Sequence, residues 1–107
     1  MTYSEVIEKF KNTQLSPGEL SELRIWLAGE YAFIASQLGD TLTLKAEFWP
    51  VERLNHKSDS STDRAWEATS RGKFEIIARL QLRSIEKMLS AIGSRIRVLE
   101  GQSKALY

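Results

Sequence analysis

The chain has 107 residues, no cysteine, one histidine and a formal net charge of +1. The lack of cysteine excludes disulfides and thiolate metal sites and suits a reducing compartment, so we expect a cytoplasmic protein. With 42% hydrophobic and 27% charged residues, the composition is that of a globular chain, which we interpret as a single helical domain over residues 1–107. There is no apolar run of about 18 residues and no basic leader with an apolar core, so we expect no membrane association.

The two halves of the chain differ in charge. Residues 1–50 carry four Lys/Arg and seven Asp/Glu, whereas residues 51–107 carry eleven and seven. Such polarisation is compatible with an anionic partner for the C-terminal half, or with the two halves packing on each other.

Two helix starts are predicted near the N-terminus. Thr2 and Glu5 have capping-box spacing, followed by Val6 and Phe10 on one side, which predicts a short helix over about 3–11. Residues 16–19, Ser-Pro-Gly-Glu, place a capping serine, a proline at the first helical position and an acid facing the helix terminus. A second helix therefore starts at about residue 17.

This second helix is predicted to be long, running over about 17–56. Its apolar residues follow a stripe close to the heptad period, whereas Phe33 and Phe48 lie off the stripe and indicate a second contact surface. Pro50 removes one backbone donor, so we expect a bend near residue 50. The polar stretch 55–62 is then the connection of a helical hairpin.

The last long helix is predicted over about 61–100, started by Ser60 or Ser61 together with Asp63. Its apolar residues form one broad face, and Ile76, Ile77 and Leu80 form a second stripe elsewhere on the cylinder. Gly72 either ends a first segment or lies within one continuous helix. Gly101 suits a C-cap, and we expect a frayed tail over 101–107.

The fold class that follows is all-α: an antiparallel hairpin of two long helices with a short N-terminal helix. Two helices cannot cover apolar stripes that face more than one way, so we expect homo-oligomerisation through them. The predicted oligomer interface consists of Trp26, Tyr31, Ile34, Leu38, Leu82, Ile85, Met88, Leu89, Ile92, Ile96 and Leu99.

Enzymatic function is not predicted. One histidine, no cysteine, no glycine-rich phosphate loop and no HExxH or GxSxG motif leave too few groups for a nucleophile or a metal site. We therefore expect no catalytic residues, no metal, no cofactor and no small-molecule substrate.

The candidate binding surface is the hairpin connection with the start of the last helix. Cations there are joined by Trp49 and Trp66, and cations with aromatic planes suit sequence-tolerant binding of single strands. The predicted nucleic-acid-binding residues are Arg53, Lys57, Arg64, Trp66, Arg71, Lys73, Arg79 and Arg83. Solvated helix faces and core tryptophans account for the same residues equally simply.

The layout of several segments resembles that of the UvsY-type phage recombination mediator family. The resemblance lies in LRIWLAGEYAFIASQL (23–38), KAEFW (45–49) and TDRAWEATSRGKFE (62–75), followed by a long aliphatic helix. It implies a small helical protein that forms oligomeric rings, binds single-stranded DNA and helps load a recombinase. It covers most of the chain as a pattern and carries no individual site residue.

Two hypotheses follow. The first is an oligomeric helical accessory protein that binds single-stranded nucleic acid, with recombination proteins as further partners. The second is a helical adaptor or inhibitor that binds other proteins and not nucleic acid.

Overall fold

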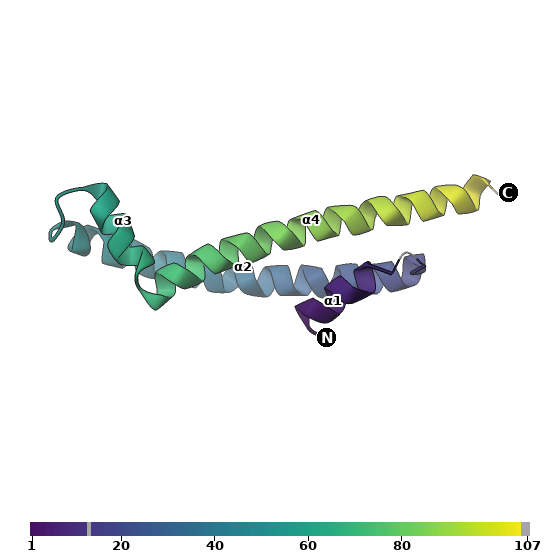
Figure 1. The fold of residues 1–107 in the computed structure, drawn as a ribbon, viewed down its shortest axis with the longest axis horizontal. Coiled ribbons are helices and arrows are strands. Elements are labelled where there is room, and N and C mark those ends of the chain that lie inside the picture. The colour runs from purple at the N-terminus through teal and green to yellow at the C-terminus, as the bar shows by residue number, and fades with distance from the viewer. Residues whose placement is uncertain (13, 106–107) are drawn as a thin grey trace. The chain divides into compact units, whose positions relative to one another are not determined.

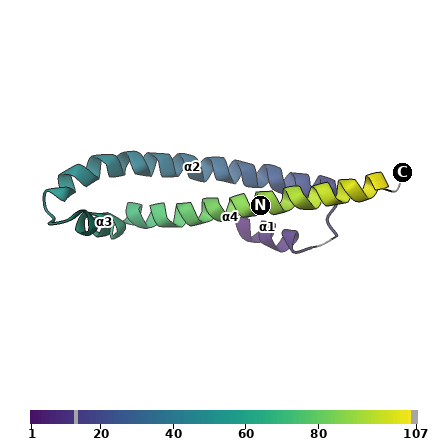
Figure 2. The same ribbon diagram turned by 90° about the horizontal axis from the view of Figure 1, so that it is seen from above.

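The computed structural model describes residues 1–12 and 14–105 and confirms the all-α prediction (Figure 1). Helix makes up 86% of the described residues, and no strand occurs among them. The elements are α1 (Tyr3–Phe10), α2 (Pro17–Arg53), α3 (Asp59–Glu67) and α4 (Ser70–Ala105), as Figure 2 also shows. The two long helices, α2 and α4, pack together.

Both predicted helix starts near the N-terminus are confirmed by their capping hydrogen bonds. Thr2 Oγ1 accepts from the Glu5 backbone N–H at 3.2 Å. At the start of α2, Ser16 Oγ accepts from Glu19 N–H at 3.1 Å, and Glu19 Oε1 accepts from Ser16 N–H at 3.3 Å. This reciprocal pair satisfies two donors that the first turn of a helix leaves without intrahelical partners.

The second long helix ends earlier than predicted. Pro50 lies inside α2, which continues to Arg53 and not to residue 56. Beyond it, three successive backbone hydrogen bonds span only three residues each, from Leu54 N–H to Val51 O through His56 N–H to Arg53 O. The chain therefore leaves the α-helix in tight turns, which Arg53 stabilises by donating to the His56 carbonyl at 2.6 Å.

The predicted helix over 61–100 is wrong in its bounds, because two helices occupy this region. Ser58 caps α3, accepting from Ser61 N–H at 3.1 Å, so the start lies before both predicted capping serines. Residues 68–69 interrupt the helix between α3 and α4, and Gly72 lies in the first turn of α4. Helix α4 continues through Gly101 to Ala105. The predicted C-cap at Gly101 is therefore wrong, and so is the prediction that the helix ends before residues 101–105. Residues 106–107 of the predicted frayed tail lie outside the described residues.

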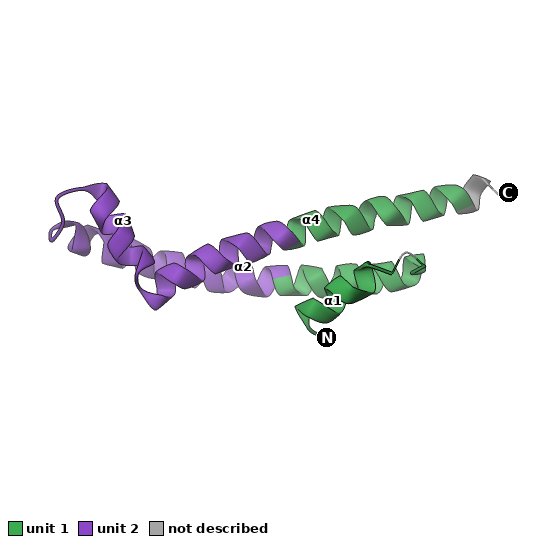
Figure 3. Ribbon diagram, in the orientation of Figure 1, with its two compact units in different colours: residues 1–30, 85–107 green, residues 31–84 purple. Residues whose placement is uncertain are grey.

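The chain divides into two compact units, residues 1–30 with 85–107 and residues 31–84 (Figure 3). Each unit takes part of α2 and part of α4, so both long helices are shared and the single domain stays a prediction. None of the helices in the described ranges combines the length and the apolar character needed to span a membrane.

The first unit, which contains α1, has its own apolar core. Arg95 fastens α1 to α4: its guanidinium donates to the carbonyls of Phe10 at 3.0 Å and Asn12 at 3.3 Å and lies 4.2 Å from the Phe10 ring centroid. These contacts satisfy acceptors at the C-terminal end of α1 with a cation. The buried apolar side chains of this unit are Val6, Leu15, Leu20, Leu23, Leu27, Ile85, Ile92 and Ile96.

The second unit contains α3 and has a smaller core. Leu38, Trp66 and Ala78 are its buried apolar side chains, and Thr41 and Thr62 are buried polar ones. The Thr62 hydroxyl donates to the Ser58 carbonyl at 3.0 Å, which satisfies it inside its own helix. A core this small leaves much of the stability of the unit to polar contacts.

Candidate functional site

The junction between α3 and α4 is built on one threonine and one glycine. Thr69 Oγ1 donates to the Trp66 carbonyl at 2.6 Å and accepts from Gly72 N–H at 3.0 Å, so it links the end of one helix to the start of the next. A Cβ at Gly72 would overlap the Trp66 carbonyl oxygen and lie 2.8 Å from the Cα of Glu67. Only glycine allows the two backbones to approach this closely.

The junction accepts a hydrogen bond at the carbonyl of Trp66, and the indole of this residue is buried inside the second unit. Trp66 is 3% exposed, its Nε1 donates to Glu75 Oε1 at 3.0 Å, and its ring centroid lies 5.4 Å from that of Phe48. Lys45 Nζ lies 5.9 Å from the same ring. The predicted role of Trp66 in nucleic-acid binding is therefore wrong in this structure, because a buried ring has no face open to a base.

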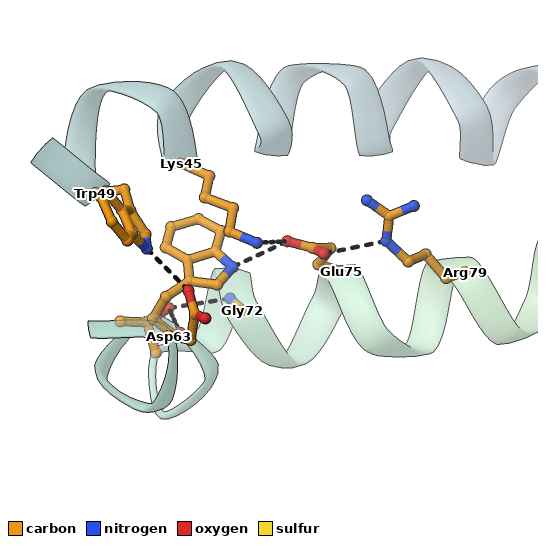
Figure 4. A network of polar contacts seen from close by, with 8 residues as sticks. Lys45, Trp49, Asp63, Gly72, Glu75 and Arg79 are labelled. Atoms are coloured by element: carbon orange, nitrogen blue, oxygen red, sulfur yellow. Dashed lines mark hydrogen bonds and ion pairs between the residues drawn. The ribbon is translucent and has the colours of Figure 1, made fainter. Parts of the chain in front are cut away.

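Glu75 is the centre of this polar cluster, which comprises Lys45, Trp66, Glu75 and Arg79 and is called here the Glu75 cluster. Its carboxylate lies 3.2 Å from Lys45 Nζ and 3.1 Å from Arg79 Nε, and its side chain is only 12% exposed (Figure 4). Burial by itself raises the pKa of Glu75, but the hydrogen bonds from Arg79, Trp66 and Lys45 outweigh it and lower the pKa. Glu75 is thus ionised at neutral pH and neutralises cations of α2 and α4.

Other carboxylates of the second unit also have internal partners. Asp63 Oδ1 accepts from the Trp49 indole N–H at 2.8 Å, and Asp59 Oδ1 lies 2.8 Å from Arg53 Nε. Near the end of α2, Glu52 Oε1 lies 3.1 Å from His56 Nε2. The turn and the α3–α4 junction are therefore fastened largely by acidic side chains.

The structure separates the predicted basic residues into two groups. Arg53 and Arg79 are paired with acids. The others are exposed, and within the described ranges their side chains make no ion pair. These residues, called here the free cations, are Lys57, Arg64, Arg71, Lys73 and Arg83.

Four of the eleven residues of the predicted oligomer interface belong to the core of the single chain. Leu38, Ile85, Ile92 and Ile96 are buried within the single chain, so assigning them to an interface between copies is wrong. Their stripes are covered by the chain's own helices. The remaining members are partly exposed: Trp26, Tyr31, Ile34, Leu82, Met88, Leu89 and Leu99.

The apolar surface that remains lies on other residues. In the second unit Phe33, Ile76, Ile77 and Leu80 are exposed by 59%, 47%, 53% and 58%. The sequence contained a signal for them, because all four lie off the main stripes of their helices. They were nevertheless absent from the predicted interface.

In the described ranges, no group of three or more His, Asp or Glu side chains is placed to hold a metal ion. The tightly held acids are tied to cations and indoles. The exposed surface of the unit includes the free cations, the four apolar side chains named above and the acids Asp40 and Glu47.

Comparison of the chain with family models, curated proteins and solved structures finds no match.

Proposed function

We propose that the protein binds single-stranded nucleic acid through the free cations, as a helical accessory protein without enzymatic activity. The observation that carries this proposal is the unequal use of charge over residues 57–84 of the second unit. Three of the four acids there are held by contacts within the fold, whereas five of the six Lys/Arg have no ion pair in the part of the chain that the structure describes.

The segment 57–84 makes the inequality clear. It contains the five free cations and four carboxylates. Three of these carboxylates have partners: Asp59 pairs with Arg53, Asp63 accepts from the Trp49 indole, and Glu75 lies in the Glu75 cluster. Glu67 is the remaining acid of this segment, all of which is described. A local excess of unpaired positive charge attracts a polyanion and releases its counterions on binding.

The proposed contacts are to phosphates and not to bases. Trp66 is buried, so its indole has no face open to a base, and the partly exposed Trp49 is held by the hydrogen bond from its N–H to Asp63. The free cations are spread over a turn and two helices, a path that a flexible single strand can follow more readily than a rigid duplex. Binding should therefore tolerate any base sequence.

The resemblance to UvsY-type mediators extends the proposal to a role in loading a recombinase. The antiparallel arrangement of α2 and α4 and the homo-oligomeric state belong to the same proposal. An oligomer would present several copies of the cationic surface to one strand and raise the affinity by multivalency.

The test is a salt titration of oligonucleotide binding by fluorescence anisotropy. Arg64→Glu/Arg71→Glu reverses two free cations, and Arg24→Glu/Arg97→Glu applies the same change of charge to exposed residues outside the second unit. The plot of log K against log salt has a negative slope. Loss of two phosphate contacts should make that slope less steep by about 1.4 for a single strand. The control pair should leave that slope close to the wild-type value.

Equal slopes for the two double variants would refute the proposed surface, because affinity would then follow net charge alone. Absence of binding by the wild-type protein at low salt would refute nucleic-acid binding altogether.

A protein-interaction module is the second candidate, supported by the exposed aliphatic side chains of α4. Ile76, Ile77 and Leu80 lie between Lys73 and Arg83 in the sequence. Aliphatic side chains carry no charge and no hydrogen-bond donor, so they do not bind phosphates. Exposed apolar surface of this kind typically marks contact with another protein.

A further inference from the structure

Two helix faces of the second unit are exposed and carry complementary features. On α2, the residues Phe33, Ser36, Asp40, Thr43, Glu47 and Val51 are all exposed, at intervals of three and four. Such intervals place them on one side of the helix, opposite the buried Leu38 and Thr41. We call these six residues the α2 stripe.

The matching face of α4 contains Lys73, Ile76, Leu80 and Arg83, at intervals of three, four and three. All four are exposed, and they lie on the side of α4 opposite the fully buried Ala78. This spacing is the one by which helices pack side by side in coiled coils. We call these four residues the α4 stripe.

The charges of the two stripes are opposite. The α2 stripe carries Asp40 and Glu47, which have no ion pair among the described residues, whereas the α4 stripe carries two free cations, Lys73 and Arg83. At 1.5 Å per residue, the acids are about 10 Å apart along their helix and the cations about 15 Å apart. Lysine and arginine side chains are long enough to close that difference.

From this complementarity we propose that a second copy of the chain covers these faces, the α4 stripe of one copy packing on the α2 stripe of the next. Ile76 and Leu80 then contact Thr43, the small residue between Asp40 and Glu47, and the cations face those two acids. Because the two stripes differ, a single contact leaves the α2 stripe free on one copy and the α4 stripe free on the other. Such a head-to-tail contact continues into a ring or a chain of copies.

A second copy accounts for both stripes at once, which other occupants do not. An anionic bilayer would attract the basic and apolar α4 stripe but would be repelled by Asp40 and Glu47. A nucleic acid would find phosphate partners in Lys73 and Arg83 but would leave Ile76 and Leu80 exposed. This contact covers two of the five free cations, Lys73 and Arg83, and leaves Lys57, Arg64 and Arg71 open to phosphates. It does not depend on the proposed nucleic-acid binding.

The experiment measures solution mass by light scattering at micromolar concentration for two variants and their mixture. Ile76→Glu/Leu80→Glu removes the α4 stripe, and Asp40→Lys/Glu47→Lys reverses the α2 stripe. The wild type should be larger than a dimer or form a concentration-dependent series, and each variant alone should be a monomer of 12.2 kDa. Gln81→Glu adds one negative charge, half of that change, on another exposed side of α4 and should assemble as the wild type does.

Mixing the two variants is the decisive step. Each retains the stripe that the other lacks, so the mixture should give a dimer of about 24 kDa, twice the 12.2 kDa of one chain, and nothing larger. A contact that used the same face on both copies would give no such rescue.

Several results would overturn the proposal: a monomeric wild type, variants that still assemble, or a mixture that stays monomeric. A monomeric wild type that binds anionic vesicles would identify a bilayer as the occupant. Should the aliphatic variant lose helical circular dichroism, Lys73→Glu/Arg83→Glu replaces it. That variant should be monomeric and should assemble again when Asp40→Lys/Glu47→Lys is added to the same chain.

Discussion

Replacing Gly72 by alanine tests whether the close approach of α3 and α4 holds the second unit together. The added Cβ would lie 2.6 Å from the Trp66 carbonyl carbon and 2.8 Å from the Glu67 Cα, where ordinary contacts begin at 3.4 Å. Both neighbours are backbone atoms, so no side-chain rotation relieves the overlap. The junction must open, and opening it breaks the hydrogen bonds that Thr69 makes on either side.

The expected loss of stability is the sum of two contributions. Loss of the Thr69 cap removes about 1 kcal/mol. Moving Trp66 away from Glu75 removes a hydrogen bond to a charged group, which contributes about 2 kcal/mol. Gly72→Ala should therefore lower the free energy of unfolding by about 3 kcal/mol, and the melting temperature by about 12 °C or more.

Urea denaturation followed by circular dichroism measures this loss, at one protein concentration because assembly shifts apparent stability. Gly93→Ala is the matched control: it lies in the same helix, and nothing is found within 4 Å of its added Cβ. It should stabilise the protein by up to about 1 kcal/mol, since alanine favours helix over glycine. If Gly72→Ala and Gly93→Ala had equal stabilities, the proposed role of the junction would be refuted.

Three further predictions concern single contacts. Folding lowers the pKa of Glu75, so the stability that its carboxylate contributes is present above about pH 4.5 and is lost as the pH falls through the lower folded pKa. Glu75→Gln should therefore be less stable than the wild type at pH 7. Urea titrations at acid pH should show this difference in the free energy of unfolding becoming smaller. Trp66→Phe keeps a ring beside Phe48 but loses the bond to Glu75, so unfolding should become easier by about 2 kcal/mol, and a change below 0.5 kcal/mol would contradict that bond. Arg95→Met removes the guanidinium from the end of α1, so amide hydrogen exchange over Tyr3–Phe10 should accelerate about tenfold while α3 exchanges as before.

The sequence predicted local features well where neighbouring residues decide them. The capping box of Ser16 and Glu19 and the cap of Thr2 involve residues three positions apart, so spacing alone identifies them. Between residues 54 and 62 several serines and aspartates offered alternative caps. The choice of Ser58 was missed because no local rule ranks these residues.

Trp66 and the basic residues around it show what spacing could not decide. A tryptophan among cations has the same sequence signature whether it stacks on bases or lies inside the fold. Its burial depends on Glu75, nine residues further along the chain, and on Lys45 and Phe48 of another helix. Likewise, which cations are paired and which are free depends on acids in other elements.

The amino-acid sequence by itself determined an all-helical chain, the starts of its first helices and the presence of apolar residues off the main stripes. Helix periodicity and capping act over a few residues, so they can be read without the fold. Only the tertiary structure decided that the main stripes contribute to the chain's own core, that Gly72 allows a close backbone contact, and that Asp59, Asp63 and Glu75 are paired within the fold. Those outcomes depend on distances between segments far apart in sequence, which are set when the helices pack.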